Sequence, residues 1–181
     1  ELHNGYYVQI PTSGKLSAAG SYAPQLHDEG FFADSYLVVC PGSTLAKNAS
    51  YRIPTAEEIL ATNGANLAEM RRLMGGSYGY HIGHIENGHL ERTRNRGSAY
   101  FALMADAPSA RLANYQSENH GGVGQNVLFE DGHVVFMTTC GVNGASFYVN
   151  DDGMIEPGLN ADDSVIAASA VVPVVFLSTG H

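Results

Sequence analysis

The chain has 181 residues, of which 44% are hydrophobic and 15% are charged, and this length fits one domain with a buried core. The formal net charge is −9, which excludes nucleic acid and anionic membrane surfaces as main partners. A charged share below the usual quarter favours an extracellular protein, or one that packs against copies of itself. No segment reaches the about 18 consecutive apolar residues of a membrane helix.

The first 53 residues predict little regular structure. Residues 6–10 are strong β formers, and Pro11 ends the strand that they predict. A small-residue linker follows over residues 12–20, and one short helical turn is expected within residues 21–30. Residues 36–40 then predict a short buried strand that turns at Pro41 and Gly42.

Residues 54–75 predict the one substantial helix. Thr55 and Glu58 have the spacing of a capping box, which would satisfy the first amide groups of the helix. Asn63-Gly64 should break the helix into two pieces, and Gly75-Gly76 should end it. Arg71 and Arg72 suit the negative C-terminal end.

Two hairpins are predicted from Asn-Gly and Asp-Gly turns, because these residues tolerate positive φ. The first covers residues 77–93 around Asn87-Gly88. The second is centred on Asp131-Gly132 and is expected to form a central part of the sheet. Its pairing would set Glu130 against His133, Phe129 against Val134, Leu128 against Val135 and Val127 against Phe136. Val127, Phe129, Val134 and Phe136 would then share one buried face.

The remaining segments predict further strands at residues 99–107, 145–149 and 171–177, with Pro173 placing the last at an edge or outside a sheet. Residues 150–153 predict a turn, and residues 160–164 an acidic loop. The predicted fold class is α+β, with a mainly antiparallel sheet and one helical excursion. It forms a single domain over residues 1–181: an N-terminal strand and linker (1–20), a globular core (21–166) and an apolar C-terminal strand (167–181).

A serine hydrolase is one functional hypothesis. Residues 75–79 match a nucleophile elbow around Ser77, and Asp106 and His120 follow in the order of a Ser–Asp–His triad. The elbow requires a strand before the serine and a helix after it, whereas here the order is reversed. A helix stop and close strand packing explain these glycines better, so we do not predict an enzyme.

Two sets of residues are candidate metal ligands. The first hairpin would place two imidazoles and two carboxylates on one face, where they could bind a metal ion. These residues are His84, Glu86, His89 and Glu91. The alternative is a solvated sheet face or a subunit contact. An oxygen cage for calcium could form from the acidic turns, although solvated turns explain most of this pattern; this set is Asp151, Asp152, Asp162 and Asp163, with Glu156 nearby. No cofactor is certain, and calcium is the candidate ion.

The two cysteines, Cys40 and Cys140, each end an apolar run. The residues alone leave a buried pair of free thiols and a disulfide open. Asn48 begins an Asn-Ala-Ser sequon, which is a weak glycosylation signal because such triplets often occur by chance.

Several motifs resemble the prepilin-like surface proteins of planctomycete-type bacteria, whose C-terminal domain has a His, nine residues and then Asp-Gly. Here ten residues separate His120 from Asp131-Gly132. The other matching segments fall between residues 20 and 166; they are 20–24, 39–43, 75–80, 101–107 and 159–165. The resemblance covers most of the chain and implies a secreted, pilin-related globular domain without implying a chemical activity.

This resemblance sets the functional expectations. Together with the low charged share and the apolar β segments at both ends of the chain, it predicts an extracellular structural subunit of a pilin-like filament or secretion-related assembly. The partner would be another copy, joined by exchange of a terminal strand, with residues 6–10 as the favoured donor. The alternative is a sensing or binding ectodomain of a membrane-anchored protein. Membrane contact is expected only through an upstream hydrophobic helix, which such proteins carry. The secreted context favours a Cys40–Cys140 disulfide, calcium in the acidic loops, and a structural role for His120 and Asp131.

Overall fold

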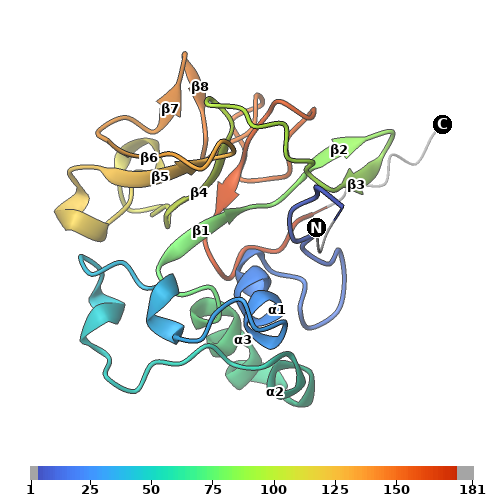
Figure 1. The fold of residues 1–181 in the computed structure, drawn as a ribbon, viewed down its shortest axis with the longest axis vertical. Coiled ribbons are helices and arrows are strands. Elements are labelled where there is room, and N and C mark those ends of the chain that lie inside the picture. The colour runs from blue at the N-terminus through green and yellow to red at the C-terminus, as the bar shows by residue number, and fades with distance from the viewer. Residues whose placement is uncertain (1–3, 175–181) are drawn as a thin grey trace.

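The computed structural model describes residues 4–174 and confirms the predicted α+β class. Its main sheet is antiparallel throughout and has the strand order β6-β5-β4-β1-β9. These strands are β1 (Tyr78–His81), β4 (Ala102–Asp106), β5 (Gln125–Phe129), β6 (Val134–Met137) and β9 (Ile166–Ala167). The helices gather at one end of the molecule, below the sheet in Figure 1, and β4, β5 and β6 lie at the other.

The long helical segment forms as predicted, in two pieces. They are α2 (Ala56–Ala61) and α3 (Gly64–Leu73), and the Thr55–Glu58 capping box is present at the start of α2. Thr62 and Asn63 separate the two helices, and Gly64, the first residue of α3, has φ of 60°, a conformation that glycine adopts without strain. A further helix, α1 (Tyr22–Asp28), is longer than the single turn expected there.

The first hairpin has the predicted register. Strands β2 (His84–Glu86) and β3 (His89–Glu91) pair His84 with Glu91 and Glu86 with His89. Asn87 and Gly88 both have positive φ, as a two-residue hairpin turn requires. The hairpin forms a separate two-stranded sheet, and its predicted continuation through residues 77–81 belongs instead to β1.

The second hairpin forms with a register that differs by one residue from the prediction. Val134 pairs with Leu128, and Phe136 pairs with Asn126. The Phe129 amide donates to the carbonyl of His133, so the connection has three residues rather than two. A shift of one residue changes the face of every side chain, so Val134 and Phe136 do not lie in the core, whereas Met137 packs against it partly buried. Val134 is 61% exposed and Phe136 is 48% exposed, which corrects the predicted burial of both.

Several short predicted elements are wrong. Residues 36–40 fall in a 3₁₀ turn, η2 (Ser35–Val38), instead of a strand. Residues 6–10 make only an isolated bridge, from Tyr6 to Arg94, and Ile10 is buried in the core. The predicted linker 12–20 ends in buried residues. There the Gly20 amide donates to the carbonyl of Ser169, which brings the two backbone segments close together.

The C-terminal third contributes short strands. The predicted strand at residues 145–149 is reduced to β8 (Ala145–Ser146), which pairs with β7 (Gly141–Val142). Residues 171–174 form no strand, and the rest of the predicted strand 171–177 lies outside the described residues. The strand β9 was not predicted. It has only two residues, and both are fully buried.

The core covers both faces of the main sheet. One face packs against α1, η2 and residues 7–10, and its members include Tyr22, Tyr80 and Leu103. The other face packs Val127 and Phe129 against Phe147, Tyr148 and Ile166. No helix among residues 4–174 has the length and apolar character needed to cross a membrane. Because the sheet is packed on both faces, it supports the loop after η2 and the loop before β5 at the place where they meet.

Candidate functional site

Three chemically active side chains meet where the last residue of β4 lies against two loops. Cys40 follows η2, Asp106 ends β4, and His120 lies in the short turn η5 (Asn119–Gly122). Cys40 Sγ is 3.1 Å from His120 Nε2, and His120 Nε2 is 3.3 Å from Asp106 Oδ2. One ligand-type atom from each residue lies within 4.8 Å of the other two. Segments up to 80 residues apart in sequence thus build one site.

Asp106 is the anchor of this site, and its carboxylate is completely buried. Oδ2 accepts hydrogen bonds from the backbone amide of Asn126 at 2.7 Å and from the side-chain amide of Asn126 at 3.2 Å. Oδ1 accepts from the side-chain amide of Asn119 at 2.8 Å. These donors compensate the burial of a charge, which would otherwise be costly.

His120 is held in an uncommon backbone conformation. Its φ of 55° and the φ of 72° at Gly121 lie in the left-handed region, which turns η5 sharply. The loop that carries Cys40 and Gly42 passes close to the His120 ring, because a Cβ at Gly42 would lie 2.9 Å from His120 Nδ1. The side chain remains 30% exposed. The site therefore has one face open to solvent.

All the polar neighbours of His120 approach the same ring nitrogen. Cys40 Sγ, Asp106 Oδ2 and, at 3.0 Å, the side-chain amide of Asn126 face Nε2. A nucleophile–histidine–aspartate relay needs the nucleophile on one ring nitrogen and the carboxylate on the other. The arrangement is thus convergent: it resembles a set of ligands around a point more than a proton relay.

Cys40 is a buried thiol with poor nucleophilic character. Burial, and then a hydrogen bond to Asp106, raise the pKa of Cys40 to about 11. The thiolate is the reactive form of cysteine, so the isolated thiol is largely unreactive near neutral pH. Asp106 and His120 do come together, as the triad hypothesis requires, but the Ser77 hydroxyl accepts the amide of Cys40 at 2.6 Å and takes no place in a relay.

The predicted Cys40–Cys140 disulfide is absent, and both residues are free cysteines. The two thiols have different surroundings: Cys40 contacts His120, whereas Cys140 Sγ lies 4.0 Å from Gln125 Oε1. Gln125 is buried and donates to the carbonyls of Met137 and Thr139, which fixes the chain just before Cys140. In the sequence both cysteines end an apolar run. This pattern does not reveal that Cys40 lies against His120 and Cys140 against Gln125.

Neither predicted metal set forms a three-ligand cluster. Across residues 4–174, three groups of this kind come within ligand distance only at Cys40, Asp106 and His120. In the β2–β3 hairpin, His84 is buried while the other predicted ligands of that set are exposed. The register pairs His84 with Glu91 and Glu86 with His89, but no three of these residues come within ligand distance of one another.

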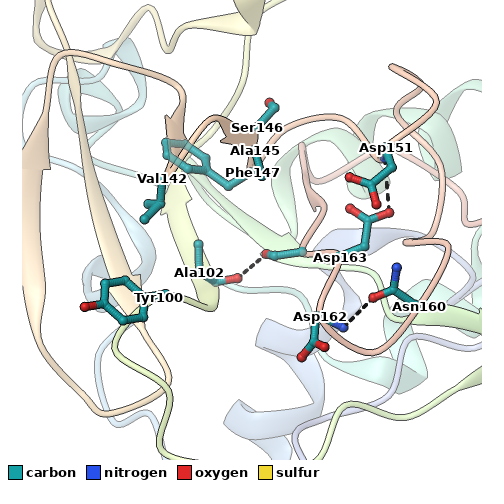
Figure 2. A pocket seen from close by; sticks show the side chains of 11 residues that line it. Tyr100, Ala102, Val142, Ala145, Ser146, Phe147, Asp151, Asn160, Asp162 and Asp163 are labelled. Carbon is teal, nitrogen blue, oxygen red and sulfur yellow. Dashed lines mark hydrogen bonds between the residues drawn. The ribbon is translucent and has the colours of Figure 1, made fainter.

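The acidic turns are explained by hydrogen bonds within the chain. Asp163 Oδ2 accepts from the amides of Asp151 and Leu159, and Figure 2 shows Asp163 directed toward Asp151. Asp162 makes an ion pair with Arg96 at 2.6 Å. Asp152 is exposed. Asp151, Asp162 and Asp163 border a pocket that is also lined by Tyr100.

The two residues of the resemblance motif lie in different surroundings. His120 contacts the Cys40 loop, whereas Asp131 Oδ1 accepts the amide of His133 at 3.1 Å and shapes the hairpin turn. Gly132 has φ of 90° in that turn. Asn48 is exposed, and its side chain accepts the amide of Ser50.

An apolar groove lies beside the Cys40–Asp106–His120 cluster. Its volume is about 360 Å³, and Asn126 and Tyr78 belong to its wall. The apolar side chains of the wall come from the loop around η2 and from the sheet; among them are Phe32, Leu37, Met104, Leu128 and Val134. Next to it, Phe136 meets His120 edge-on, with 5.6 Å between the ring centroids.

Comparison with family models, curated proteins and solved structures finds no match. The functional argument therefore depends on the geometry. Sequence reasoning named Asp106 and His120 but assigned Cys40 to a disulfide. The signal that was present is the Val-Cys-Pro-Gly-Ser segment, in which Gly42 allows the loop to approach the His120 ring.

Proposed function

We propose that this chain is a pilin-related structural subunit of an extracellular assembly, and that it associates with other copies through the edge of β6. The observation that carries the proposal is this edge strand. β6 is the outermost strand of the main sheet, and Val134, Val135 and Phe136 on it are all exposed. An edge strand with apolar side chains on both faces is suited to pair with another strand.

The opposite edge of the sheet is less suited to such a contact. β9 has two residues, and residues 18–20 and 168–171 fold back near it through hydrogen bonds between Ala19 and Val171 and between Gly20 and Ser169. Protein edges are commonly protected by charge, by proline or by a covering segment. β6 carries neither a charge nor a proline, because its four residues are Val, Val, Phe and Met.

The N-terminal segment is not free to exchange with a neighbouring copy. Tyr7, Val8 and Ile10 pack against the core cluster of their own domain, and the Tyr7 amide bonds to the carbonyl of Thr93. Removing this segment would uncover the core. Addition of a neighbour's β6 to β6 instead leaves the domain intact, and it forms a two-fold pair; a filament then needs a second contact elsewhere.

The test is the oligomeric state of the purified chain. We expect concentration-dependent association by sedimentation velocity, and Val135→Lys should abolish it because a lysine on an edge strand opposes pairing. Leu60→Lys, which places the same charge on an exposed apolar position of α2, is the matched control and should associate normally. A monomeric wild-type chain, or equal association of Val135→Lys, would refute the proposal.

A binding ectodomain is the second candidate, and the apolar groove beside β5 favours it. A groove of about 360 Å³ with mainly apolar walls is large enough for a small apolar ligand. An environment-sensitive dye such as anilinonaphthalene sulfonate should then bind the folded chain, and Leu37→Asp should remove the binding while Leu60→Asp preserves it. Equal dye binding by the two variants would remove this candidate.

A further inference from the structure

We propose that Cys40, Asp106 and His120 bind one Zn²⁺ ion, with a fourth coordination position open to water. The proposal concerns these three side chains and does not depend on pairing of the β6 edge, although Phe136 of β6 borders His120.

The donor set and its spacing support zinc. Thiolate, imidazole and carboxylate are the three ligand types that Zn²⁺ takes in proteins, with bonds of about 2.0–2.3 Å, so that tetrahedral neighbours lie about 3.4–3.6 Å apart. The observed separations are 3.1 Å from Cys40 Sγ to His120 Nε2 and 3.3 Å from His120 Nε2 to Asp106 Oδ2. A small outward movement of each side chain would therefore admit the ion.

The hydrogen bonding around His120 Nε2 gives an independent reason. This one nitrogen has either a proton or a lone pair to offer, yet it faces a thiol, a carboxylate and an amide. No single protonation state satisfies all three neighbours. A cation at the centre would accept a lone pair from the sulfur, the nitrogen and the carboxylate oxygen at once, and the thiol proton of Cys40 would pass to water.

The surroundings of the ligands have the form of a supporting shell. Asn119 and the backbone amide of Asn126 fix the two oxygens of Asp106, and Ser77 fixes the amide of Cys40. Such outer contacts orient metal ligands and commonly affect affinity by about tenfold or more. The left-handed backbone of His120, uncommon for a residue other than glycine, is the local cost of aiming this ring into the site.

Access and donor number point to an exchangeable position. Cys40 and Asp106 are fully buried, whereas His120 is 30% exposed. An ion held by three side chains therefore has its remaining position on the His120 side, facing solvent. Three ligands and one water form an open zinc site, in contrast to the closed four-ligand sites of structural zinc.

The experiment uses the whole chain, treated with a chelator and kept reduced with a phosphine. Added Co²⁺ should produce a thiolate-to-cobalt charge-transfer band that saturates at one equivalent, and added Zn²⁺ should bleach the band and raise the melting temperature by several degrees. Cys40→Ser should lose the band, and Cys140→Ser, which removes the other thiol, should keep it.

Histidine variants keep the test decisive if Cys40→Ser does not fold. His120→Ala removes a partly exposed ligand and should weaken Zn²⁺ binding by at least about tenfold. His133→Ala, at the hairpin turn, should bind as the wild type does. Absence of a cobalt band in the wild-type chain, a band that depends on Cys140, or equal Zn²⁺ affinity in the two histidine variants would overturn the proposal.

Discussion

Two aspartate–histidine pairs lie near opposite ends of the β5–β6 hairpin, and they differ in almost every respect. Asp106 and His120 come from β4 and η5, and the carboxylate is buried with three hydrogen-bond donors. Asp131 and His133 are two residues apart within one turn, and both are substantially exposed. The first pair joins remote segments, whereas the second only shapes a local connection.

The aromatic neighbours of the two pairs are reversed in burial. The buried pair has the exposed Phe136 at its rim, edge-on to His120. The exposed pair has the buried Phe129 beneath it, whose ring stacks on His133 with 4.6 Å between the centroids. A polar pair and the aromatic ring beside it therefore differ in burial. Substitutions can separate the contribution of the ring to stability from that of the pair.

The largest effect is expected from the aromatic rings. Phe129→Ala should lower the free energy of unfolding by about 3–5 kcal/mol, because it leaves a cavity in the core. Phe136→Ala should lower it by about 1 kcal/mol or less, since that ring is 48% exposed. Denaturant unfolding of monomeric protein measures both values. Equal losses would show that Phe136 is buried and that the observed register is wrong.

The second effect separates the two carboxylates. Asp106→Ala leaves the backbone amide of Asn126 without its acceptor and removes one acceptor from each of the side-chain amides of Asn119 and Asn126, so it should cost about 3 kcal/mol in the free energy of unfolding. Asp131→Ala should cost clearly less, because water replaces the lost contacts in an exposed turn. If the two variants unfold at the same denaturant concentration, the buried pair is not a structural anchor.

The third effect concerns the thiols, which differ in access. Cys40 is fully buried and its pKa is raised to about 11, whereas Cys140 is partly exposed. With a chelator present, a thiol reagent should label Cys140 in the native protein and should label Cys40 at least about tenfold more slowly. Peptide mapping by mass spectrometry distinguishes the sites. Labelling that requires prior reduction would show a disulfide after all.

The two hairpins show what could be predicted from sequence. Around Asn87-Gly88 the pairing follows directly from the turn, because both residues accept positive φ and a two-residue connection allows one register. Around Asp131-Gly132 the same rule fails. Glu130 is buried, its amide bonds to the carbonyl of Phe101, and its carboxylate accepts the amides of Arg96 and Ser98. These contacts with another part of the chain draw Glu130 into a three-residue connection.

The same limit applies to the candidate site. The α2–α3 break and the capping box were predictable because their signals lie within a few residues. The meeting of Cys40, Asp106 and His120 depends on two loops that sequence periodicity does not place against the end of β4, and on Gly42 leaving room for the His120 ring. The order Ser77, Asp106 and His120 indicated the right region of the fold, since Ser77 lies beside Cys40 and accepts its amide.

The smallest expected effect is the acid titration of the exposed pair. The hydrogen bond from the His133 side chain, and then the His133 amide, hold the pKa of Asp131 below its ordinary value of 3.8. A carboxyl with a lowered pKa stabilises the native state above its unfolded pKa, and this contribution is lost as the pH falls through the folded pKa. The loss therefore belongs to strongly acidic solution, below about pH 4.

Carbon-detected NMR titration of the Asp131 carboxyl group tests this contribution. In the wild-type chain its midpoint should lie below the ordinary value, and in His133→Ala it should move upward because the main hydrogen-bond donor is removed. His120→Ala is the matched control, since it removes the histidine of the other pair and should leave the Asp131 midpoint unchanged. A midpoint unaffected by His133→Ala would mean that the turn backbone, and not the imidazole, determines the acidity of Asp131. The hairpin end would then be held by backbone geometry alone, and the comparison between the two pairs would reduce to one aspartate–histidine contact and one turn.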